Sequence, residues 1–86
     1  MADKGHLQVL VINPDDVVFD GEAEYVLAPT TKGTVGILPG HTPLFAEVTQ
    51  GEIIISHASG EDEKFSVDSG ILKVRADTVT ILIGLE

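Results

Sequence analysis

Residues 71–83 of this 86-residue chain read ILKVRADTVTILI. Leu72 and Val74 alternate with Lys73 and Arg75, and from Thr78 onwards Val and Ile alternate with Thr. Alternation with a period of two residues, rich in β-branched side chains, is the signature of a half-buried β-strand. This stretch therefore predicts two strands, Ile71–Arg75 and Thr78–Ile83, each with one face in a core.

The rest of the chain repeats short apolar runs separated by Gly, Pro, Asn and Asp. We read Asn13–Asp16, Asp20-Gly21 and Ser59–Asp62 as turns. No stretch of about 12 residues has a convincing helical pattern. Short, regularly interrupted strands predict a single all-β domain over residues 1–86, either a sandwich or a flattened barrel. The further predicted strands are Leu7–Ile12, Val17–Phe19, Glu24–Ala28, Thr34–Leu38, Leu44–Thr49, Glu52–His57 and Lys64–Val67.

The first predicted strand is apolar on both faces, with Val9 and Val11 on one and Leu10 and Ile12 on the other. Such a strand is either covered on both sides or partly reserved for a partner.

The amino-acid composition argues against several classes of function. The chain has 14 acidic and 5 basic residues, a net charge of −9 and no cysteine. Nucleic-acid binders need a basic stripe, so we expect no nucleic-acid partner, and the acidity fits solubility or a basic protein partner. The apolar runs are far shorter than the roughly 18 residues of a membrane span, so we expect no membrane insertion. The N-terminus has no signal-peptide pattern.

The sequence shows no catalytic or metal-binding motif. His6, His41 and His57 are too far apart to form a local ligand motif. The acidic clusters lack the spacing of a calcium loop, and no serine lies in a nucleophile-elbow sequence. We expect no metal, no cofactor and no enzymatic activity.

Residues 30–44 stand out because they hold three of the nine glycines and two of the four prolines. Pro39-Gly40 fits the centre of a type II turn, and Pro43 stiffens the chain beyond His41. These residues form either a rigid functional loop or a sharp corner between sheets.

Several segments together are similar to a known family. They are residues 17–24 (VVFDGEAE), Pro29-Thr30, the run Gly33-x-x-Gly36-Ile37-Leu38-Pro39-Gly40-His41-x-Pro43-Leu44, residues 69–74 (SGILKV) and Asp77-x-Val79-Thr80-Ile81-Leu82. This order of motifs resembles the epsilon subunit of bacterial F-type ATP synthase over nearly the whole chain.

The resemblance implies a flattened ten-strand β-sandwich in the central stalk. Such a domain binds no cofactor and catalyses nothing. It docks the gamma subunit to the polar loops of the c-ring, and so helps to couple proton-driven rotation to ATP synthesis. Its implied location is peripheral, on the cytoplasmic face of the bacterial inner membrane.

The resemblance also implies site residues. His41 matches a histidine of the gamma and c-ring contact region, with Thr42, Pro43 and Leu44 beside it. Asn13 falls where relatives face gamma. Thr34 stands where many relatives carry a carboxylate aimed at the c-ring, and Lys32 makes this loop less acidic still. The resemblance therefore leaves two alternatives: either the c-ring loop differs as well, or the contact rests on shape and hydrogen bonds, since an exposed ion pair contributes little.

The family usually continues into a two-helix inhibitory domain, which we do not expect in a chain that stops at Glu86. Two other readings remain open. One is a stand-alone ligand- or protein-binding sandwich, although four aromatic residues and no Trp disfavour sugar stacking. The other is a small hydrolase that uses His41 with a nearby carboxylate.

Overall fold

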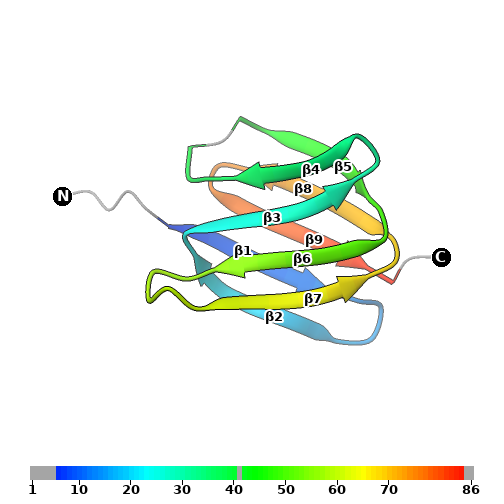
Figure 1. Ribbon diagram of the computed structural model, residues 1–86, viewed down its shortest axis with the longest axis horizontal. Coiled ribbons are helices and arrows are strands. Elements are labelled where there is room, and N and C mark those ends of the chain that lie inside the picture. The colour runs from blue at the N-terminus through cyan, green and yellow to red at the C-terminus, as the bar shows by residue number, and fades with distance from the viewer. Residues whose placement is uncertain (1–5, 41, 85–86) are drawn as a thin grey trace.

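The computed structural model describes residues 6–40 and 42–84, which form nine strands and no helix (Figure 1). The predicted all-β class is confirmed, and the count of ten strands that the resemblance implied is not. The strands are β1 (Leu7–Ile12), β2 (Val17–Ala23), β3 (Tyr25–Thr30), β4 (Gly33–Ile37), β5 (Leu44–Val48), β6 (Gly51–Ser56), β7 (Asp62–Val67), β8 (Gly70–Arg75) and β9 (Thr78–Ile83).

The strands form two layers of one strongly curled sheet (Figure 1). One layer has the order β2-β1-β9-β8-β5, and the other has the order β4-β3-β6-β7. The layers join at one corner, where Thr30 of β3 pairs with Val48 of β5. Two further backbone bonds close this corner: the Thr31 N–H donates to the Glu47 carbonyl over 3.1 Å, and the Thr49 N–H donates to the Pro29 carbonyl over 3.0 Å. β1 and β9 are parallel, and the other pairings of the described strands are antiparallel.

The core lies between the two layers and follows the predicted alternation. In β8, Leu72 and Val74 are buried, whereas Lys73 and Arg75 are exposed. Fully burying an aliphatic side chain of this size stabilises a fold by about 1.5–3 kcal/mol, so these positions hold the layers together. The buried apolar residues are Leu7, Val9, Val11, Ala23, Val26, Ala28, Ile37, Val48, Ile53, Ile55, Val67, Leu72, Val74, Val79 and Ile81.

The turn predicted at Asp20-Gly21 is wrong, because both residues lie inside β2, where Gly21 pairs with Val9. The glycine at position 21 is required by close packing against the Phe19 ring and not by a turn. A Cβ at position 21 would lie 3.3 Å from Cζ of Phe19, so the missing side chain makes room for the ring. β2 therefore extends to Ala23, four residues past its predicted end at Phe19.

β3 also runs further than predicted, through Pro29 to Thr30. Proline cannot donate to a sheet ladder and is confined to positions where no donor is needed. Here β6 pairs with β3 only from Tyr25 to Leu27, so the proline follows the end of that pairing.

The other turn predictions agree with the structure. Gly40 has φ +86°, as the third residue of a type II turn requires, and Gly60 has φ +95° at the tip of the β6–β7 hairpin. The β8–β9 turn is made by Ala76 and Asp77, with φ of 48° and 64°. Two consecutive left-handed residues match the type I′ turn of a tight hairpin.

The two faces of β1 differ in burial. Val9 and Val11 are in the core, whereas Leu10 and Ile12 are half-buried on the outer face of the β2-β1-β9-β8-β5 layer. No described strand packs over this outer face (Figure 1). Of the two alternatives for β1, a strand covered on both sides by the described chain is excluded.

Candidate functional site

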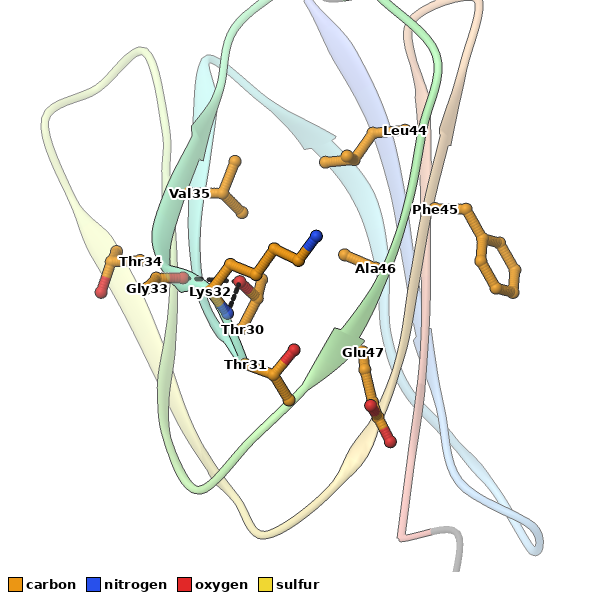
Figure 2. A pocket seen from close by; sticks show the side chains of 10 residues that line it. All are labelled: Thr30, Thr31, Lys32, Gly33, Thr34, Val35, Leu44, Phe45, Ala46 and Glu47. Carbon is orange, nitrogen blue, oxygen red and sulfur yellow. Dashed lines mark hydrogen bonds between the residues drawn. The ribbon is translucent and has the colours of Figure 1, made fainter.

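A groove lies at the edge of the sandwich where β4 and β5 face one another. β4 pairs with β3 alone, and β5 pairs along its length with β8, so no described strand fills the space between them. The cavity here has a volume of about 450 Å³. Its lining comes from the β3–β4 turn and the two strands: Thr30, Thr31, Lys32, Gly33, Thr34, Val35, Leu44, Phe45, Ala46 and Glu47 (Figure 2).

The β3–β4 turn that closes one end of the groove is fixed by Thr30. Its buried hydroxyl donates to the Gly33 carbonyl over 2.6 Å and accepts from the Lys32 N–H over 3.1 Å. Gly33 has φ +113°, which favours glycine at this point. The backbone that carries Lys32 is therefore held by local hydrogen bonds on both sides of the turn.

The groove has apolar walls and one cation. Val35 from β4 and Leu44 and Ala46 from β5 point into it, and the Lys32 side chain extends across it (Figure 2). These three apolar side chains are half-buried and pack against the core. Thr34 points away from the opening (Figure 2). The groove can therefore accept an apolar segment of a partner, with the lysine stem as part of the contact.

The predicted site residues divide between the two ends of the molecule. Lys32 and Leu44 line this groove, and Thr34 borders it near the β3–β4 turn with its side chain turned away. Thr42 and Pro43 are exposed and precede β5 at the opposite end of the sandwich (Figure 1). His41 lies outside the described residues.

Asn13 is engaged in its own turn. Its Oδ1 accepts from the backbone N–H groups of Asp15 and Asp16 over 2.8 and 2.7 Å. This turn joins β1 to β2 at the same end of the molecule as the β3–β4 turn (Figure 1). The local role of Asn13 is to stabilise a loop, and a contact with gamma remains a prediction.

A hydrogen bond missed by sequence reasoning holds the β4–β5 connection. The Gly40 N–H donates to Oδ1 of Asp77 over 2.7 Å, across 37 positions of sequence. It ties the Pro39-Gly40 turn to the β8–β9 turn. The predicted strands Ile71–Arg75 and Thr78–Ile83 left Ala76 and Asp77 between them, but the partner of the Asp77 carboxylate depends on tertiary structure.

The edge between β2 and β7, which we call the filled edge, is bridged by an aromatic cluster, beside which a smaller hollow of about 310 Å³ opens at Glu22, Ala23 and His57. The Phe19 ring lies 5.8 Å from the His57 ring and 6.1 Å from the Phe65 ring, measured between centroids. Nε2 of His57 is 2.9 Å from Oε2 of Glu63. Residues 6–40 and 42–84 contain no group of three or more His, Asp or Glu side chains placed to hold a metal ion. They also contain no helix long and apolar enough to cross a membrane.

The fold and the groove define a small β-sandwich domain with one open edge. Comparison with known families gives its membership. The model of the family described as "ATP synthase, Delta/Epsilon chain, beta-sandwich domain" matches residues 6–84, and the chain belongs to this family.

Curated relatives agree. The chain is 43% identical over 76 residues to the ATP synthase epsilon chain of Bordetella petrii, which covers 88% of this chain and 54% of that protein. It is 41% identical, with the same coverage, to the ATP synthase epsilon chain of Bordetella avium. The chain therefore spans about half the length of the curated relatives it matches.

Solved structures share the fold. A chain of the Euglena gracilis mitochondrial ATP synthase OSCP/F1/c-ring structure has a TM-score of 0.88 at 15% identity, covering 96% of this chain and 53% of that one. A chain of the Tetrahymena thermophila mitochondrial ATP synthase central stalk/c-ring structure has a TM-score of 0.75 at 17% identity, covering 95% and 66%.

Proposed function

We propose that this chain is a non-catalytic central-stalk subunit of a rotary ATP synthase. In this role it docks the gamma subunit to the polar loops of the c-ring and helps to couple proton-driven rotation to ATP synthesis. It would work peripherally, at the cytoplasmic face of the bacterial inner membrane. The observation that carries the proposal is the family match over residues 6–84, which leaves almost none of the chain for a different function.

The open edge supports docking to gamma. Val35, Leu44 and Ala46 offer an apolar groove of about 450 Å³ that the described chain does not fill. A partner side chain that entered it would remove apolar surface from water at about 25 cal/mol per Å². Thr42 and Pro43 continue this edge at its far end, so one partner could contact both.

The β3–β4 turn supports docking to the c-ring. Lys32 and Thr34 are exposed there, and the Thr30 hydrogen bonds give the turn a fixed shape. An exposed ion pair contributes about 1 kcal/mol or less, so a turn without the family's carboxylate still docks through shape and hydrogen bonds. The β1–β2 turn of Asn13 lies at this same end (Figure 1).

The test is calorimetric titration of the chain with the gamma subunit of its own complex. Leu44→Ala should weaken binding about tenfold, because it removes apolar contact from the groove. Leu27→Ala is the matched control, since Leu27 is also half-buried but lies on β3, outside the groove lining. Equal weakening by both variants would argue against the groove as the contact, and absence of binding by the unmodified chain would refute the proposed function.

A further inference from the structure

A second exposed surface lies on the outer face of the β5-β8-β9 sheet, and of its residues only Phe45 also borders the groove. Phe45 of β5 pairs with Lys73 of β8, which in turn pairs with Thr80 of β9. One step along, Arg75 pairs with Thr78. Directly paired residues share a face of the sheet, so these five side chains form one patch, which we call the β8 patch.

The β8 patch combines charge with exposed apolar surface. Phe45 is 70% exposed, among the largest exposures of the described apolar residues, and it points away from the groove (Figure 2). Two shallow hollows lie within the β8 patch. One, of about 410 Å³, is lined by Pro43, Phe45 and both cations, and the other, of about 440 Å³, is lined by both cations and the two threonines. Open hollows of this kind suit a segment of a protein better than an enclosed small molecule.

The cations of this patch are unpaired, which is unexpected in a chain of net charge −9. Among residues 6–40 and 42–84, neither Lys73 nor Arg75 has an ion-pair partner. Oδ1 of the nearby Asp77 accepts from the Gly40 N–H, which turns this carboxylate toward the β4–β5 connection, although its negative charge remains. Glu47 shares this face but pairs with Ile71, so it borders the patch.

The remaining acids of this face are too far away to neutralise the patch. Asp20 and Glu22 lie on β2, which is separated from β8 by β9 and β1. Three strand spacings amount to about 14 Å. The Debye length is about 8 Å at physiological salt, so their field is largely screened at the patch.

We propose that the β8 patch is a docking surface for an acidic segment of a partner protein that also carries apolar side chains. Lys73 and Arg75 would donate charge-assisted hydrogen bonds to its carboxylates, and the hydroxyls of Thr78 and Thr80 would add donors. Phe45 would pack against the apolar side chains. The chain's overall negative charge repels acidic partners elsewhere, so the patch would also fix the orientation of approach. This proposal is independent of whether the groove binds gamma.

The test is a nuclear magnetic resonance titration of the isotopically labelled chain with a short peptide that alternates Glu and Leu, at physiological salt. We expect shifts centred on Phe45, Lys73, Arg75, Thr78 and Thr80. A peptide that alternates Lys and Leu should shift other residues. Shifts from the acidic peptide that centre elsewhere, or no binding of it, would overturn the proposal.

Charge-reversal variants distinguish a local effect at the β8 patch from an effect of the chain's net charge. Lys73→Glu should weaken binding of the acidic peptide about tenfold or more. Lys64→Glu, on an exposed position of β7 in the other layer, makes the same change in net charge and should weaken it less than about twofold. Equal weakening by both would contradict a local site. Vesicles of anionic lipid, if they bound the patch more tightly than the peptide, would overturn the proposal in favour of a membrane surface.

Discussion

β2 and β7 border one edge of the sandwich, and β4 and β5 border the other (Figure 1). The first edge is filled by the rings of Phe19, His57 and Phe65, whereas the second is a groove lined by Val35, Leu44 and Ala46. A sandwich edge exposes unpaired backbone groups and core side chains unless something covers it. One edge is therefore bridged by side chains of the chain itself, and the other is available to a partner.

The largest expected effect concerns the filled edge. Phe19→Ala should lower the free energy of unfolding by about 2 kcal/mol, because it removes a half-buried ring that packs on the core. Phe45→Ala is the control, since this exposed ring should change stability by no more than about 0.5 kcal/mol. Urea unfolding measures both, and equal losses would remove the distinction between the two rings.

The open edge depends on the hydroxyl of Thr30. Thr30→Val keeps the shape but leaves the Lys32 N–H and the Gly33 carbonyl without this partner. We expect a loss of about 1–2 kcal/mol in urea unfolding. Thr34→Val, at an exposed position of β4, should stay within about 0.5 kcal/mol. If Thr30→Val left the free energy of unfolding unchanged, the turn would not depend on these hydrogen bonds.

The β4–β5 connection gives a third comparison. Asp77→Ala should cost about 1 kcal/mol, because it removes the acceptor of the Gly40 N–H and places alanine at φ 64°. Asp77→Asn keeps an acceptor oxygen and tolerates this φ, so it should cost about 0.5 kcal/mol or less. Thermal unfolding distinguishes them, and a negligible loss for Asp77→Ala would mean that the bond to Gly40 contributes nothing.

The smallest effect is expected at the hydrogen bond between His57 and Glu63 at the filled edge. Glu63→Gln removes the charge 2.9 Å from Nε2 of His57, but Glu63 is 47% exposed and the amide oxygen can still accept. We expect stability to change by about 0.5 kcal/mol or less in urea unfolding. A clearly larger loss would show that the pair, and not the aromatic cluster, completes this edge.

Much of the fold could be predicted from the sequence because the signals are local. The alternation of Leu72 and Val74 with Lys73 and Arg75 already assigned inner and outer faces, and Gly40 and Gly60 marked turns that the structure confirms. The turn predicted at Asp20-Gly21 was wrong because a glycine in this dipeptide can also make room for a neighbouring side chain within a strand. Only the long-range position of the Phe19 ring distinguishes the two.

The candidate site was harder to predict, because it depends on pairings between distant strands. Lys32, Thr34 and Leu44 came from the family resemblance, and the structure places all three around one groove. Nothing local indicates that β4 and β5 leave an open edge, or that Phe45 of β5 lies opposite Lys73 of β8. Such contacts depend on the order of strands in the sheet. The alternation of apolar and polar residues within a single strand does not predict that order.

We propose that the open edge, and not the filled one, receives the stalk partner. The most direct measurement is amide hydrogen exchange of the chain with and without the gamma subunit of its own complex. We predict slower exchange on binding in Gly33–Ile37 and Leu44–Val48, and unchanged exchange in Asp62–Val67. Protection confined to Val17–Ala23 and Asp62–Val67, with β4 and β5 unchanged, would place the contact at the filled edge instead.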